Sequence, residues 1–193
     1  MVVPTFSQTS NQSTCNLTVT QSPTVRCIRL GMSAEEVFAL FPGSAERRDY
    51  KDAILSAQVS PNYGVARLYF QPAAYPSPAK DRFSGIDSIS ITLFDGRATE
   101  ITVTYTGYPK GPSWLNVDDF ITKLSDAFAL PGSKDWLQSG GDLYSKTLKC
   151  SGFEIRASNQ RNASMSLSNN SYTETVRQRA AADEERKRRE FKP

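Results

Sequence analysis

A pattern that occurs twice along the chain most constrains what it can fold into. Each copy is an amphipathic helix closed by Pro-Gly, followed by segments that alternate between apolar and polar residues. The first helix begins at Ser33, which forms an S-x-x-E capping box with Glu36, and stops before Pro42. The second begins at Asn116, carries a strong apolar stripe, and stops before Pro131. The repetition predicts an α+β fold: two helix-plus-antiparallel-strand units forming one sheet with helices packed on one face.

Alternating segments predict the strands of this sheet. Residues 88–94 and 100–105 place Ile, Leu and Val on one side and Ser and Thr on the other, and Asp95-Gly96 between them favours a tight hairpin turn. An apolar side and a hydroxyl-rich side are typical of an antiparallel sheet with one face in water. The Pro-rich segment 72–78 is expected to lack regular structure. Further strands are expected at 64–71, 144–150, 153–157 and 163–167.

The 193-residue chain divides by composition into a body and two polar ends. A body of roughly 140 residues can bury enough surface to fold without a metal or a dense disulfide framework. We expect three regions: a polar N-terminal arm (1–24), a tandem α/β domain (25–170, with units 25–107 and 113–170), and a charged C-terminal tail (171–193), helical or disordered.

Charge and hydropathy limit the classes of partner that the chain is expected to have. The tail contains seven Lys and Arg residues but also five Asp and Glu residues, and these acids cancel much of the field that nucleic-acid binding needs. We therefore expect no nucleic-acid partner. The longest unbroken run of aliphatic and aromatic residues, Val37 to Phe41, is far shorter than the ~20 residues of a membrane-spanning helix. No transmembrane segment is expected.

The chain has no histidine, which excludes Ser-His-Asp and Cys-His catalysis and any zinc site that uses imidazole. We find no spacing that assembles carboxylate, Lys, Tyr or Ser-Lys chemistry, and so expect neither an enzyme nor a cofactor. An enzyme would have to take its acid and base from Asp87, Asp95, Glu100 or Glu154. Of these, Asp95 is explained by the hairpin turn and Glu100 by its strand.

Three cysteines, Cys15, Cys27 and Cys150, do not form a C-x-x-C motif. One reading is three reduced, partly buried thiols in a cytosolic protein. The other is one disulfide and one odd thiol in an exported protein. We favour a Cys15–Cys150 disulfide with Cys27 unpaired, because this link would tie the N-terminal arm to the last strands of the sheet and close a long loop.

Residues 29–37 read RLGMSAEEV, and FPG follows at 41–43. This stretch resembles the opening of the SmpA/OmlA outer-membrane lipoprotein family, and the tandem pattern looks like that of β-lactamase inhibitory protein. The chain is also similar to uncharacterised exported proteins of the Acidobacteria that open with VRGIRLGM, where Cys27 of this chain replaces the glycine. Unlike a lipoprotein, the chain has no apolar segment before Cys15 and hence no lipobox. The resemblance implies a non-catalytic extracytoplasmic module that binds protein through its sheet face.

The sequence and the resemblance also give expectations for the cellular location and the oligomeric state. From Met1 onward there is no basic segment followed by an apolar one, so no signal peptide is visible. We expect an extracytoplasmic protein, periplasmic or secreted, whose leader is missing from this chain; a cytoplasmic location is the alternative. We expect a monomer.

The candidate binding surface is the sheet face opposite the helices, where a few aromatic or Arg side chains would anchor a partner protein. A face rich in Ser and Thr is also simply how a soluble sheet meets water. A small-ligand or lipid carrier is the alternative function, and it requires an apolar cavity between helices and sheet; a histidine-independent enzyme is the third. The candidate binding residues are Arg67, Tyr69, Ser90, Thr92, Thr102, Thr104, Lys149 and Arg156.

Overall fold

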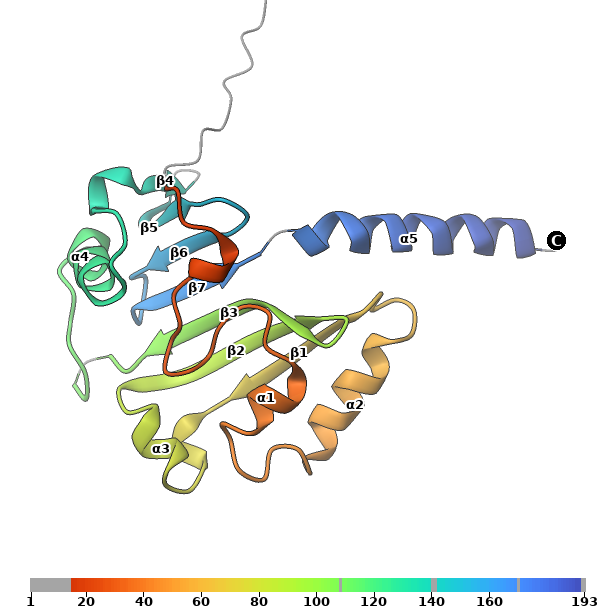
Figure 1. Ribbon diagram of the computed structural model, residues 1–193, viewed down its shortest axis with the longest axis horizontal. Helices are drawn as coiled ribbons and strands as arrows, with labels where there is room; N and C mark the ends of the chain where they lie inside the picture. The colour runs from red at the N-terminus through yellow and green to blue at the C-terminus, as the bar shows by residue number, and fades with distance from the viewer. Residues whose placement is uncertain (1–14, 108, 140–141, 170, 192–193) are drawn as a thin grey trace, which may run out of the picture.

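The structure, a computed structural model, describes residues 15–107, 109–139, 142–169 and 171–191. These residues form one seven-stranded antiparallel sheet of order β1-β2-β3-β7-β6-β5-β4 (Figure 1). The α+β fold class is confirmed. The strands are β1 (Val65–Phe70), β2 (Ile86–Phe94), β3 (Arg97–Tyr105), β4 (Leu137–Ser139), β5 (Asp142–Lys149), β6 (Glu154–Ser158) and β7 (Ser164–Ser168).

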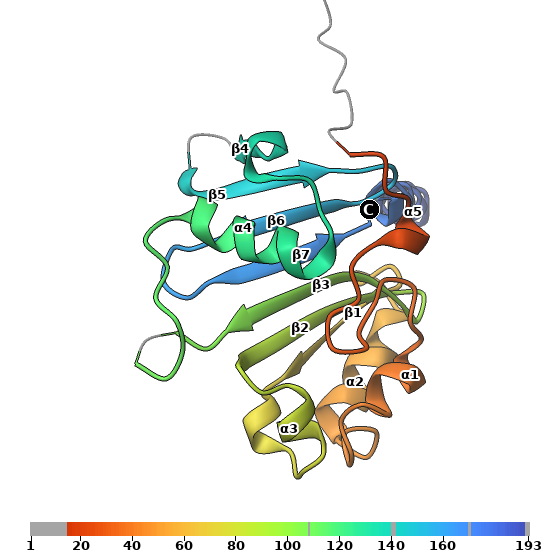
Figure 2. The same ribbon diagram turned by 60° about the vertical axis from the view of Figure 1, so that its left-hand side comes forward.

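Helices α1 to α4 cover one side of the sheet. Figure 2 shows α4 lying across β5, β6 and β7, with α1 and α2 beside the β1 end. Helix α5 passes the β2–β3 turn, which it contacts, and then projects beyond the sheet (Figure 1). No helix in the described residues is both long and apolar enough to cross a membrane. The helices are α1 (Ala34–Phe38), α2 (Arg48–Ala57), α3 (Ala79–Arg82), α4 (Val117–Phe128) and α5 (Ser171–Glu190), with short 3-10 turns η1 (Val19–Gln21), η2 (Pro72–Ala74) and η3 (Ser133–Asp135).

Strand register shows that α2 and α4 pack on the same side. Tyr50 of α2 packs against Phe70 of β1, with ring centroids 5.0 Å apart. In the second unit, Lys146 of β5 pairs with Asp118 of α4 at 2.6 Å. Directly opposed residues of neighbouring strands point to the same side, and one such row runs through Phe70, Ile89, Val103, Met165, Ala157 and Lys146. The predicted placement of the helices on one face is therefore confirmed.

An aromatic cluster forms the core of the first unit. Phe41 stacks on Phe70 and on Phe83, with ring centroids 4.2 and 4.8 Å apart. All three rings are buried, and aromatic burial of this kind contributes more to the core than any other side-chain class. The capping box that begins α1 is confirmed: Ser33 Oγ accepts from the Glu36 amide, and Glu36 Oε2 accepts from the Ser33 amide.

Helix α4 supplies the core of the second unit. The Asn116 side chain caps it by accepting a hydrogen bond from the Asp119 amide at 3.0 Å. Its stripe, including Phe120, Ile121 and Leu124, is buried against the sheet. The helix ends at Phe128, two residues before the predicted Leu130-Pro131-Gly132 stop.

The pairing of β3 with β7 joins the two units into one sheet. The strands run antiparallel over five residue pairs, from Glu100 opposite Ser168 to Thr104 opposite Ser164. The predicted hairpin between β2 and β3 is also present: Asp95 and Gly96 both have positive φ, the geometry of a type I′ turn.

The sequence pattern did not predict helix α2 or the helical turns in and after the Pro-rich segment. Helix α2 has no predicted counterpart, although Tyr50, Ala53, Ile54 and Ala57 recur at i, i+3, i+4 and i+7 and pack against the core. Two of these four residues are alanines, and Leu55 is exposed on another side of the helix, so the stripe is weak. The expectation that the Pro-rich segment lacks regular structure is wrong. It contains η2, and α3 begins directly after Pro78, since proline is tolerated where a helix starts.

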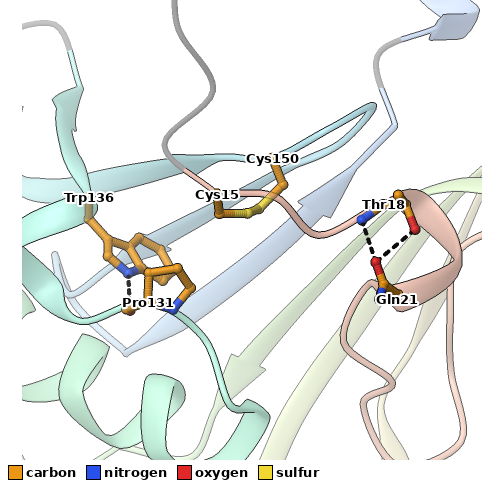
Figure 3. Close-up of a disulfide and its surroundings, with 6 residues drawn as sticks. All are labelled: Cys15, Thr18, Gln21, Pro131, Trp136 and Cys150. Carbon is orange, nitrogen blue, oxygen red and sulfur yellow. Dashed lines mark hydrogen bonds between the residues drawn. A yellow bond between two sulfur atoms is a disulfide. The ribbon is translucent and has the colours of Figure 1, made fainter.

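The N-terminal segment 15–33 lies along the sheet and contacts both units. The Cys15 amide donates to the Lys149 carbonyl of β5 at 3.1 Å, and a disulfide joins Cys15 to Cys150 (Figure 3). At the other end, the Ala98 amide of β3 donates to the Met32 carbonyl at 2.8 Å. The proposed Cys15–Cys150 pairing is therefore present, and Cys27 is free and exposed.

A tight turn with unusual backbone angles interrupts this segment. Val25 and Ile28 exchange two backbone hydrogen bonds, and both side chains are buried. Between them, Arg26 and Cys27 have φ of 50° and 75°, although neither is the glycine or asparagine that such a turn favours. The left-handed conformation at Cys27 is one that glycine adopts without strain.

Loss of the disulfide is expected to lower the free energy of unfolding by about 3–5 kcal/mol, because it closes a loop of 135 positions and so restricts the unfolded chain. Urea unfolding of the Cys15→Ser/Cys150→Ser double variant measures the effect. The Cys27→Ser variant is the control and should keep the parental stability. A parental protein whose unfolding midpoint is the same with and without reductant would contradict the expectation.

Relief of the strained turn is a separate prediction. The Cys27→Gly variant should gain about 0.5–1 kcal/mol of unfolding free energy, the left-handed penalty removed less the entropy that glycine adds to the unfolded chain. Cys27→Ala, which keeps the Cβ atom, should stay near the parental value. Equal stability of the Gly and Ala variants in urea unfolding would show that the turn carries no strain.

Candidate functional site

The side of the sheet opposite α1–α4, here called the open face, carries rows of polar side chains. Neighbouring strands bring residues into register, so that each row crosses the sheet perpendicular to the strands. The central row consists of Tyr69, Ser90, Thr102, Ser166, Arg156, Thr147 and Leu137. It reaches from one edge strand to the other.

Two further rows flank the central one. All eight candidate residues lie on the open face, distributed over these three rows and five strands. The row nearer the β2–β3 turn consists of Arg67, Thr92, Glu100, Ser168, Glu154 and Lys149. The row on the far side consists of Ser88, Thr104, Ser164, Ser158 and Ser145.

The candidates differ in how far a partner could reach them. Tyr69 is 52% exposed, whereas Thr92 is 5% exposed and donates its hydroxyl to the Glu100 carboxylate at 3.2 Å. In the central row the Thr102 and Ser166 hydroxyls hydrogen-bond each other at 3.1 Å. Thr92 thus serves the sheet itself, while Tyr69 stands out from it.

A polar cluster on the open face holds Arg156 in place. Arg156 donates to Ser145 Oγ at 3.0 Å and to the Asp142 carboxylate at 3.3 Å. Ser145 also donates to Asp142 at 2.6 Å. The Ser145 hydroxyl and the Tyr144 amide lower the pKa of the Asp142 carboxyl, which makes it a poor general base. Ser145 is itself fully buried, so the cluster fixes the orientation of Arg156 and is not an activated nucleophile.

The carboxylates considered for an enzyme are placed apart. Asp95 is in the β2–β3 turn, and Asp87 is an exposed residue of β2. Glu100 and Glu154 lie on the open face with Ser168 between them, so their backbones are about 10 Å apart at the usual strand spacing. Among the described residues, no group of three or more His, Cys, Asp and Glu side chains could hold a metal ion.

The first half of α5 borders the open face near the β2–β3 turn. Its Tyr172 ring lies 5.7 Å from the ring of Phe94. Arg179 donates two hydrogen bonds to the Asp95 carboxylate, at 2.8 and 2.7 Å, and its guanidinium lies 4.8 Å from the centre of the Phe94 ring. One turn later, Asp183 accepts from the side chains of the α2–β1 loop.

The contacts of Arg179 and Asp183 anchor α5 to the sheet, and only strong acid is expected to break them, because both carboxylates involved are paired with cations. The hydrogen bonds from Arg179 hold the pKa of the Asp95 carboxyl below its usual value. The pKa of Asp183 is lowered as well, chiefly by Lys187 and then by Ser60. A carboxyl whose pKa is depressed by folding stabilises the folded state above its usual pKa, and the contribution is lost as the pH falls through the depressed value. The contacts of α5 should persist down to about pH 4.

Several residues of the open face were not among the candidates. The alternation of Ser164, Ser166 and Ser168 with buried Met165 and Leu167 already predicts that these serines face water. Their position between the strands of Thr102 and Arg156 could not be predicted from the sequence, because it depends on β7 pairing with both β3 and β6.

Comparison with protein-family models, with curated proteins and with solved structures gave no match. The resemblances drawn from the 29–37 segment therefore stay predictions, and function has to be inferred from the surface alone.

The anchor of α5 gives a local prediction. In the Arg179→Ala variant, backbone amides 172–183 should exchange their hydrogens about five to ten times faster, because a half-exposed ion pair and a cation–π contact are together worth roughly 1 kcal/mol. Arg188→Ala, a change at an exposed residue of the same helix, is the matched control. Equal exchange in the two variants, measured by mass spectrometry, would show that Arg179 does not hold the helix.

Proposed function

We propose that the protein is a non-catalytic extracytoplasmic module that binds another protein through the open face of its sheet. The observation that carries the proposal is the arrangement of the eight candidate residues: all lie on the side of a continuous sheet opposite α1–α4, and all but Thr92 are at least partly exposed.

The size of the open face suits a protein partner. Seven strands spaced about 4.8 Å apart span roughly 30 Å, and three rows of side chains separated by about 7 Å extend it along the strands. A surface of these dimensions approaches the ~800 Å² that each partner contributes to a standard protein interface. A small molecule would occupy only a fraction of it.

The composition of the open face favours binding at a low entropic cost. Most of its side chains are Ser and Thr, which have few rotamers to lose, and they are carried by strands that are already ordered. Tyr69 and Arg156 are of the residue types that most often dominate interface energies. Arg156 is already oriented by Ser145 and Asp142, which further reduces the ordering that binding requires.

The disulfide supports the proposed location. Disulfides persist in the periplasm and outside the cell, and thiols are kept reduced in the cytosol of most organisms. The Cys15–Cys150 link is therefore compatible with an exported protein, in agreement with the location that the resemblance implies.

Photo-crosslinking in the producing cells tests the proposal. A photoreactive residue replacing Ser166, in the central row, should give a discrete adduct with one partner protein. The same residue replacing Thr122, an exposed position of α4 on the opposite side, is the control and should not. Adducts formed only from position 122 would contradict the proposal.

A bulky substitution on the open face allows the effect on partner affinity to be measured. In the purified complex, Thr102→Arg should weaken partner binding at least tenfold, because the longer side chain would hold the partner off the central row. Thr122→Arg introduces the same change on the helix side and should bind like the parent. Equal binding by both variants, with both folded by circular dichroism, would exclude the open face as the interface.

A further inference from the structure

A groove of about 780 Å³ lies between the two units on the helix side of the sheet. We call it the inter-unit groove. Its walls come from the 24–26 turn, the start of β2, the end of β3, the 110–114 linker and α4. Ligand pockets in proteins commonly have volumes of ~300–1,000 Å³, so the groove can hold a small organic molecule. It is separate from the open face, which is on the other side of the sheet.

Aromatic rings form much of the wall. Phe120 of α4 packs edge-on against Tyr105 of β3, with ring centroids 5.6 Å apart, and lies 5.5 Å from the Trp114 ring. Phe128 adds a fourth ring from the last turn of α4. Tyr105, Trp114 and Phe128 are only partly buried, so their apolar surface is incompletely covered by the protein itself. Flat rings with an exposed surface favour contact with another flat ring.

The charge of the lining is of one sign. Arg26, Lys110 and Lys123 line the groove, and no carboxylate does so among the residues that the structure describes. Three cations beside an apolar wall attract an anion whose remaining surface is apolar. Asp119 and Asp126 lie one turn from Lys123 on α4 and reduce its field, but neither lines the groove. This one-sided lining contrasts with α5, where acids and bases alternate.

Local backbone structure places two of these cations. Arg26 occupies the strained turn between Val25 and Ile28, and strained backbone is often retained where it serves a binding site. Lys110 lies in a turn closed by the Gly111 amide, which donates to the Gly107 carbonyl at 2.8 Å. A Cβ atom at Gly111 would lie 1.8 Å from the Thr106 carbonyl oxygen, so this turn requires glycine.

The Tyr105 hydroxyl adds a neutral donor. Burial raises the pKa of Tyr105 to about 12, and the nearby Arg26 charge opposes this only in part. At neutral pH the phenol therefore keeps its proton. A protonated phenol beside a guanidinium can donate to an anionic oxygen.

We propose that the inter-unit groove binds a small aromatic anion, a flat ring system that carries a carboxylate or sulfonate group. The rings of the ligand lie against the partly exposed Tyr105, Trp114 and Phe128, which Phe120 supports from beneath, and its anionic group is bound by Arg26, Lys110 and Lys123. The proposal is independent of the protein-binding function, because it concerns the opposite side of the sheet.

Fluorescence titration of the full chain tests the groove. The probe is anilinonaphthalenesulfonate, and the neutral dye phenylnaphthylamine is its uncharged counterpart. The sulfonate dye should bind with one site and quench Trp114, and the quenching should disappear in Trp114→Phe. Saturable binding that Trp114→Phe leaves unchanged in stoichiometry and quenching would place the dye elsewhere and overturn the proposal, as would the absence of binding.

Charge variants separate the anion site from simple hydrophobic binding. Arg26→Gln and Lys123→Gln should each weaken the sulfonate dye about five- to tenfold while leaving the neutral dye unchanged. Lys134→Gln, at an exposed position that does not line the groove, is the matched control and should bind both dyes like the parent. Equal losses for both dyes, or no loss for either, would overturn the role of the cations.

A competition experiment tests whether the apolar part of the ligand is aromatic. Naphthoate should displace the sulfonate dye, and dodecanoate, which has the same carboxylate on an alkyl chain, should do so at least tenfold less effectively. Equal displacement by the two would overturn the aromatic assignment. Because Thr102→Arg lies on the open face, it should leave dye binding unchanged even where it abolishes partner binding, so the two proposals can fail separately.

Discussion

The pairing of β3 with β7 is the interaction on which the rest of the structure depends. Each unit alone would expose an unpaired strand edge, and the five residue pairs from Glu100–Ser168 to Thr104–Ser164 join these edges into one sheet. The register of this pairing also decides which side chains share a face. A shift by one residue would turn the serines of β7 toward the helices and Met165 and Leu167 toward water.

Joining the units in this way creates two different surfaces. On one side, small hydroxyl side chains from five strands form most of a broad polar face, with larger side chains such as Tyr69, Arg67, Glu154 and Arg156 standing among them. On the other side, α1–α3 and α4 cover their own units, and the groove between them remains lined by aromatic rings and cations. The N-terminal segment contacts both units, and the disulfide fastens it to the second. A broad face suits a macromolecule, and a groove suits a small molecule.

The sequence predicted the structural elements that depend on residues close together in the chain. The capping box of Ser33, the positive-φ turn at Asp95 and the apolar stripe of α4 are each determined by residues a few positions apart. Alternation likewise predicted that Tyr69 and Thr102 point away from the core. Helix α2 was missed although its signal is also local: Tyr50, Ala53, Ile54 and Ala57 recur at helical spacing, but two of them are small alanines and the exposed Leu55 interrupts the pattern.

The sequence by itself determined that each unit contains a helix and antiparallel strands, and which side of each predicted strand is apolar, since capping and alternation act over a few residues. The edge strand β4 was not predicted. Only the tertiary structure decided that the strand order is β1-β2-β3-β7-β6-β5-β4, that Thr92 is covered while Tyr69 is exposed, and that Arg26 and Lys123 line one groove. These features arise from contacts between residues tens of positions apart. Their free energy comes from backbone pairing and burial across the joined units, which no short pattern records.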